Sequence, residues 1–133
     1  MPGVQVKWTG GVQFLAADEA GHVVVTDRDG QGFKPPDLLL TALAACAGID
    51  VVRILEKKRQ KFTSIEASVI KHNAPDPPWC IEKIEIEWCV RGRGLKQKAV
   101  EDAVRLAEES YCSVSASLSS ELVTTVRIFN EEE

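Results

Sequence analysis

The sequence has no excess of positive charge. Sixteen Lys and Arg residues stand against twenty Asp and Glu residues, which gives a formal net charge of -4. Proteins that bind nucleic acid through its phosphates normally have a basic surface, so this balance argues against a nucleic acid partner. It argues equally against a general attraction to anionic membranes. The composition therefore favours a small molecule or another protein as the partner.

Long apolar segments and an N-terminal targeting signal are also missing. The longest apolar run, "LLLTALAACAGI" from Leu38 to Ile49, is too short to cross a bilayer. The opening "MPGVQVKWTG" has neither the charged nor the apolar region of a secretory signal. We therefore expect a cytoplasmic protein that does not enter a membrane. In a reducing compartment the four cysteines are expected to be thiols.

Motifs for metal and phosphate are absent or weak. No C-x-x-C occurs, and His22 and His72 lie at no zinc-site spacing from a cysteine. The glycines of "GQG" and "RGRG" lack the strand, loop and helix context of a phosphate-binding loop. A hydrolase with a cysteine nucleophile would need a base, and only His22 or His72 could serve.

The order of predicted elements indicates a single α+β domain over residues 1–133. Alternating apolar and polar residues from Val4 to Thr26 predict an antiparallel meander of three strands. A loop then leads to a long helix from about Pro36 to about Gln60. Two strands, a second helix, a short Ser-rich helix and a last strand follow, at residues 62–70, 81–90, 100–111, 113–121 and 123–129.

The long helix carries the residue of most chemical interest, Cys46. Its first half is apolar on every side, which is typical of a helix enclosed by protein. At 100° per residue, Cys46 begins a stripe that turns polar at Asp50 and Arg53. A free cysteine in such a place can be a small core residue or a reactive thiol, and the pattern alone leaves both open. Arg53 lies two turns from Cys46, so activation would need a cation from outside this helix, and Arg28 and Lys34 in the preceding loop are the nearest of these in sequence.

Cys112 lies at the end of the second helix, and its separation in sequence from Cys46 does not by itself predict a disulfide. Cys80 is expected in a loop and Cys89 on the charged face of a strand, and neither has a partner at short range in the sequence. The serines of "SVSASLSS" after Cys112 have no histidine nearby and are interpreted as a polar helix face. The alternating residues Ile84, Ile86, Trp88 and Val90 are expected to share one buried strand face.

Two segments, "KPPDLLLTALAACAGIDVVRILEKKRQ" and "YCSVS", resemble the OsmC/Ohr family of osmotically inducible and organic hydroperoxide resistance proteins. The likeness extends in order through "VKWTGGVQFLA", "VVVTD" and "AVRLAEESYCSVS". It implies an OsmC-like α+β fold, with antiparallel sheets around a long buried central helix. It also implies an intertwined homodimer with active sites at the subunit interface, and chemistry that needs no metal and no organic cofactor.

The same resemblance implies a thiol peroxidase that acts in oxidative stress. Cys46 would attack an organic hydroperoxide, Cys112 would resolve the product as a disulfide, and a small thiol or dithiol would reduce the pair. Members of the family hold the reactive thiolate near an arginine and a glutamate. Arg28 is the arginine of the preceding loop, whereas Pro36 stands at the glutamate position with Asp37 beside it. The alternative is an OsmC-like redox-sensing or small-ligand-binding module with little or no turnover.

Overall fold

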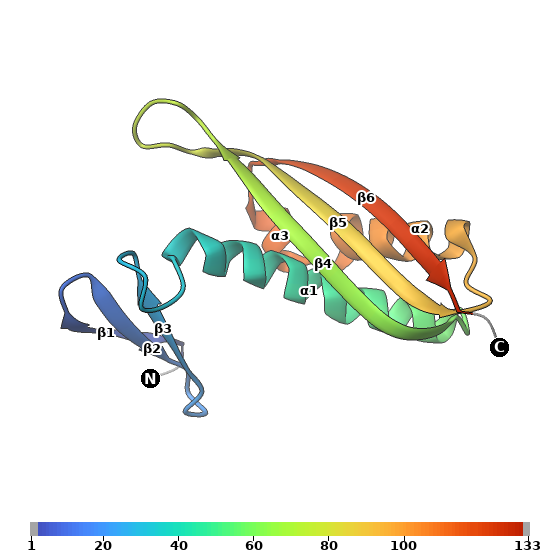
Figure 1. Ribbon diagram of the computed structural model, residues 1–133, viewed down its shortest axis with the longest axis horizontal. Helices are drawn as coiled ribbons and strands as arrows, with labels where there is room; N and C mark the ends of the chain where they lie inside the picture. The colour runs from blue at the N-terminus through green and yellow to red at the C-terminus, as the bar shows by residue number, and fades with distance from the viewer. Residues whose placement is uncertain (1–2, 132–133) are drawn as a thin grey trace. The chain divides into compact units, whose positions relative to one another are not determined.

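A computed structural model describes residues 3–131 of the chain, with an α+β architecture as expected (Figure 1). The chain divides between Leu39 and Leu40 into two compact units, of which the second is the larger. Three strands form the sheet of the first unit, namely β1 (Gln5–Gly10), β2 (Gln13–Ala17) and β3 (Val23–Asp27). All are antiparallel neighbours, which confirms the predicted meander.

One face of the small sheet carries apolar side chains that are exposed. The register pairs Val6 with Ala16 and Trp8 with Phe14, so these side chains point to the same side. Val6 and Trp8 are each 62% exposed and Phe14 is 37% exposed. Three strands need a packed face for independent stability. The first unit therefore leaves apolar area available for a further contact.

Helix α1 (Pro35–Lys57) begins with two prolines and has Asp37 in its first turn, which suits the positive end of the helix dipole. It ends three residues before the predicted Gln60, because Arg59 takes a left-handed conformation with φ of 55°. One stripe is buried, comprising Leu40, Leu43, Ala47, Val51 and Leu55. The opposite stripe of Ala42, Ala45 and Ile49 is exposed, so a single chain does not enclose α1 as the sequence led us to expect.

By length and composition α1 could cross a membrane, since an 18-residue window of it has a mean hydropathy of 2.1. The apolar run from Leu38 to Ile49 was therefore too short a segment from which to judge whether this helix could cross a membrane. Core helices of soluble proteins have the same property, and the buried stripe of α1 packs within the core of the second unit. The length of this helix is accordingly weak evidence for a membrane span.

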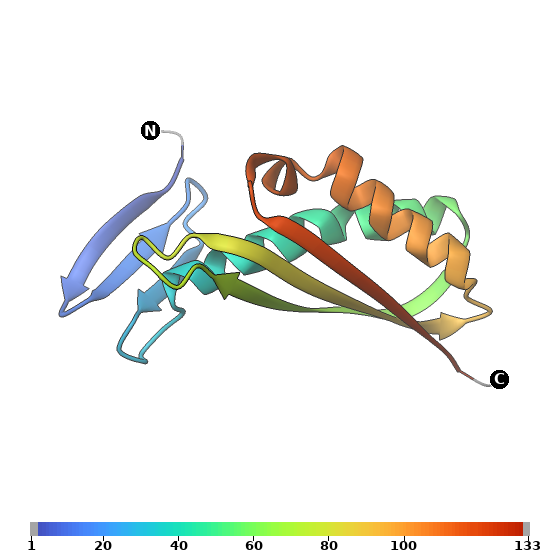
Figure 2. The same cartoon turned by 90° about the horizontal axis from the view of Figure 1, so that it is seen from above.

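The sheet of the second unit contains β4 (Lys61–Asn73), β5 (Ile81–Arg93) and β6 (Glu121–Asn130) in that order. β4 and β5 pair antiparallel, but β5 and β6 run parallel, which differs from the expected all-antiparallel pairing. The cause is the connection, because a helical crossover between β5 and β6 returns the chain in its original direction. Helices α1 and α2 lie on one side of this sheet (Figure 2).

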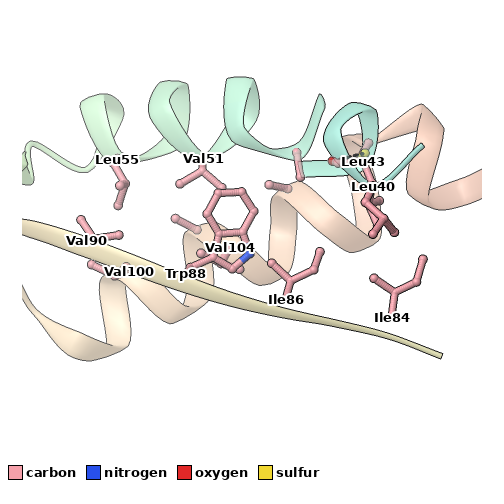
Figure 3. Packing of buried hydrophobic residues seen from close by; sticks show 14 of the residues in the cluster. Leu40, Leu43, Val51, Leu55, Ile84, Ile86, Trp88, Val90, Val100 and Val104 are labelled. Atoms are coloured by element: carbon pink, nitrogen blue, oxygen red, sulfur yellow. Dashed lines mark hydrogen bonds between the residues drawn. The ribbon is translucent and has the colours of Figure 1, made fainter. Parts of the chain in front are cut away.

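The crossover consists of α2 (Gln97–Leu106), a π-helical turn η1 (Ala107–Tyr111) and α3 (Ser113–Ser117). The predicted helix over residues 100–111 thus widens in its last turn. Side chains from α1, β5 and α2 meet in the core, where Val51 and Val104 approach Trp88 (Figure 3). The predicted strand face of Ile84, Ile86, Trp88 and Val90 is confirmed, because each is at most 2% exposed.

Glu108, in η1, is a buried carboxylate of the second unit, with 6% of its surface exposed. It accepts hydrogen bonds from Thr124 Oγ1 at 2.8 Å and from Trp88 Nε1 at 3.3 Å. Desolvation raises the pKa of Glu108 despite these two donors. The π-helical turn is therefore tied to both β5 and β6 immediately before Cys112.

The close approach of β4 to β5 at Gly92 leaves no room for a side chain at this position. A Cβ atom at Gly92 would lie 2.1 Å from the Lys61 carbonyl oxygen, so Gly92→Ala should lower the free energy of unfolding by about 1–3 kcal/mol. Gly48→Ala is the matched control, because its Cβ would meet only Trp88 at 3.8 Å and helical Gly is disfavoured. Urea denaturation at fixed protein concentration measures both. Equal stability of Gly92→Ala and the parent would contradict this packing.

Candidate functional site

Two cysteines distant in sequence meet in the second unit. Cys46 is half-buried on α1, one residue from the fully buried Ala47. Cys112 is 3% exposed and links η1 to α3. Its Sγ lies 3.9 Å from the Leu43 carbonyl oxygen, one turn before Cys46 on α1. The chain segment that ends the crossover is therefore docked against the segment of α1 that carries the first thiol.

The Cys46 sulfur faces hydrogen-bond donors from this segment. A bond from the Val114 backbone N–H, followed by one from the Cys112 side chain, lowers the pKa of Cys46 below its usual value. The backbone N–H and the hydroxyl of Ser113 contribute in the same direction, with Ser113 Oγ at 3.9 Å from Cys46 Sγ. Hydrogen bonds to the charged form favour a thiolate, so this arrangement stabilises negative charge on Cys46.

Cys112 has the opposite tendency. Burial raises the pKa of the Cys112 thiol, and its proximity to Cys46 adds to the effect. Its sulfur accepts a hydrogen bond from the Ser115 backbone N–H at 3.3 Å, which caps α3. Two adjacent thiols thus have separated proton affinities. One is suited to be the attacking thiolate, and the other is held as a protonated neighbour.

The thiolate environment anticipated from Arg28 and Asp37 belongs to the first unit. Arg28 is exposed in the turn after β3, and Asp37 is exposed in the first turn of α1, where its backbone N–H donates to the Lys34 carbonyl at 2.9 Å. Lys34 is also exposed. A contribution of Arg28 or Asp37 to the chemistry of Cys46 stays a prediction.

Other candidate groups lie elsewhere. His72 bonds Glu85 Oε2 at 2.8 Å and pairs in register with Lys83, on the sheet face that points away from the core and α1. It is not placed as a base for Cys46. His22 bonds Asp18 in the first unit. Cys80 is exposed in the β4–β5 connection, and Cys89 is half-buried on the outer face of β5. Within residues 3–131, no three metal-ligating side chains gather in one place.

Ser113 is the residue that sequence reasoning missed. The serines after Cys112 were interpreted together as a polar helix face, and Ser117 does bond within α3, to the Ser113 carbonyl at 2.8 Å. The Ser113 hydroxyl instead faces Cys46, a residue 67 positions away. The signal that the sequence offered for Ser113 was its position directly after Cys112. Only the docking of α3 beside α1 shows which serine of the run approaches the thiol.

Comparison with known proteins gives one family. The sequence profile described as OsmC-like protein matches residues 28–127. Protein YhfA of Escherichia coli (strain K12) is 37% identical over 117 residues, which is 86% of this chain and 87% of that protein.

Solved structures agree with the sequence comparison. A hypothetical protein from Aquifex aeolicus VF5 superposes with a TM-score of 0.90 and 30% identity, covering 99% of this chain and 98% of that one. The organic hydroperoxide resistance protein OhrB of Bacillus subtilis superposes with a TM-score of 0.64 and 17% identity, covering 97% and 98%. At 17% identity the comparison with OhrB shows a shared fold alone.

Proposed function

The chain belongs to the OsmC family, and from that premise we propose that it is a thiol peroxidase that reduces organic hydroperoxides through Cys46 and Cys112. The observation that carries the proposal is the pair itself. A half-buried thiol with a lowered pKa accepts a hydrogen bond from a buried thiol with a raised pKa. The hydroperoxide-resistance proteins among the structural neighbours supply the substrate class.

The reaction begins when the Cys46 thiolate attacks the terminal oxygen of the hydroperoxide. The O–O bond breaks, Cys46 becomes a sulfenic acid, and the departing alkoxide takes a proton to become an alcohol. Cys112 then loses its proton and attacks the Cys46 sulfur, and the sulfenic oxygen leaves as water. Two electrons from a small thiol or dithiol reduce the resulting disulfide. These steps require no metal or organic cofactor.

The surface of α1 around Cys46 favours an organic peroxide over hydrogen peroxide. Ala42 and Ile49, about one helical turn on either side of Cys46, are exposed and apolar. An apolar wall lowers the free energy of a bound alkyl group, which hydrogen peroxide lacks. We place this reaction in the cytoplasm, where thiol reductants keep such a pair reduced.

A second copy of the chain is the partner that we propose for the exposed apolar surfaces. Val6 and Trp8 on the first unit and Ile49 on α1 are each more than half exposed. Contiguous exposed apolar groups mark association surfaces, and a homodimer is the most common way to cover them. In such a dimer the exposed stripe of α1 would lie at the subunit interface, with Ala42 and Ile49 also bordering the substrate site beside Cys46.

A redox-sensing or ligand-binding module with little turnover is the alternative function. The observation that favours it is Pro36, because proline cannot supply the carboxylate that other family members hold near the thiol. A sensor would form the same disulfide but slowly, so the rate of peroxide consumption distinguishes the two functions.

Peroxidase activity is tested with purified protein, tert-butyl hydroperoxide and an excess dithiol. The parent should consume this peroxide faster than hydrogen peroxide, and Cys46→Ser should lose the activity because no thiolate remains to attack. Cys112→Ser should still form a Cys46 sulfenic acid, which dimedone traps. Cys80→Ser is the control, since Cys80 is exposed in the β4–β5 connection. Undiminished turnover by Cys46→Ser would refute the proposed function.

The dimer is tested by sedimentation of the parent and two charged variants. We expect the parent to sediment at twice the 14.6 kDa chain mass. Ile49→Glu should shift it toward the monomer, because a carboxylate buried in an apolar interface costs several kcal/mol. Ile70→Glu is the matched control, since Ile70 is 58% exposed and Ile49 is 54% exposed, but Ile70 lies on β4. A monomeric parent would rule out this partner.

A further inference from the structure

Ser113 occupies the first position of α3, and its hydroxyl approaches the reacting sulfur. Ser113 Oγ lies 3.9 Å from Cys46 Sγ, within the range of a hydrogen bond to sulfur. A serine hydroxyl rotates freely and carries one proton that it can donate. A thiolate can only accept, so when Cys46 is ionised the hydroxyl is necessarily the donor of this pair.

The position of the hydroxyl is fixed by the turn that also places the second thiol. The Ala116 backbone N–H donates to the Cys112 carbonyl at 3.0 Å, and Ser117 Oγ donates to the Ser113 carbonyl at 2.8 Å. The Ser115 N–H donates to Cys112 Sγ at 3.3 Å. The position of Ser113 is therefore coupled to that of Cys112. One short segment brings the resolving thiol and the hydroxyl to Cys46 together.

We propose that Ser113 is a catalytic hydrogen-bond donor that holds Cys46 as a thiolate for attack on the hydroperoxide. This inference rests on the proposed function, because it assigns Ser113 a part in the first step of that reaction. The hydroxyl keeps its proton throughout. It stabilises charge on sulfur before the attack, and that charge departs with the alkoxide.

The effect of one donor at this distance is moderate. A hydrogen bond to a charged group shifts an equilibrium by about tenfold when it is well formed, and an exposed partner reduces this. Ser113 is exposed in the single chain. Its removal should therefore lower the thiolate fraction of Cys46 by about three- to tenfold at pH values below the midpoint of its titration, which is a rise of about half a unit to one unit in pKa.

The test compares Ser113→Thr with Ser113→Val, two side chains of equal shape that differ in the hydroxyl. Iodoacetamide labelling of the Cys46 peptide is followed by mass spectrometry from about pH 5 to about pH 10, a span chosen to bracket an ordinary thiol pKa. All four cysteines are retained, so the Cys112 contact to Cys46 is preserved. Ser119→Ala is the control, because Ser119 is exposed and lies beyond α3.

We expect Ser113→Thr and Ser119→Ala to keep the parental labelling midpoint and Ser113→Val to raise it by about half a unit to one unit. The kcat/KM for tert-butyl hydroperoxide should fall by the same factor in the valine variant at pH values below the parental labelling midpoint and return to the parental value well above it. A merely structural role would change the unfolding temperature without separating Thr from Val in this pH profile. Identical midpoints for the two variants would overturn the inference.

The two proposals fail separately. Labelling uses no peroxide, so a protein that consumes none still reports whether Ser113 shifts the Cys46 midpoint. Conversely, an active peroxidase whose Thr and Val variants have the same midpoint and the same kcat/KM profile retains the proposed function and loses the role of Ser113.

Discussion

The burial of one stripe of α1 against β5 is the constraint on which the site depends. Leu43, Ala47 and Val51 are at most 1% exposed, and Trp88 of β5 fills the space opposite them. Because a helix is rigid, fixing this stripe also fixes the direction of every other side chain on α1. Cys46 lies beside the stripe and is only half-buried. Its sulfur can thus contact the segment after η1 while part of the side chain stays accessible, as the proposed reaction requires.

Local patterns in the sequence were sufficient for the elements but not for their partners. The alternation that ends at Trp88 and Val90 identified the buried face of β5, and helical spacing identified α1 and α2. The parallel pairing of β6 with β5 depends on where a crossover lands, which no local pattern encodes. The π-helical turn has the same origin, since Glu108 bonds to Trp88 and Thr124 on two separate strands.

The chemistry of Cys46 shows the same division. Its place on the helix could be predicted, whereas the groups that favour its thiolate could not. Sequence reasoning named Arg28, whose contribution stays a prediction, and within the second unit hydrogen bonds from Val114, Cys112 and Ser113 lower the pKa of Cys46. Neutral donors fixed by backbone geometry stabilise charge without a salt bridge. Because these donors share a segment with the second thiol, the proposed activation of Cys46 and the proposed resolution by Cys112 depend on one docked turn.

The most direct measurement of this account is non-reducing peptide mass spectrometry after one equivalent of tert-butyl hydroperoxide. The account predicts a disulfide between the Cys46 and Cys112 peptides, formed in proportion to the peroxide. Cys80, which is exposed, and Cys89, which is half-buried, serve as internal references and should remain thiols. Consumption of the peroxide without a Cys46–Cys112 link, or with a link through Cys80 or Cys89, would contradict it.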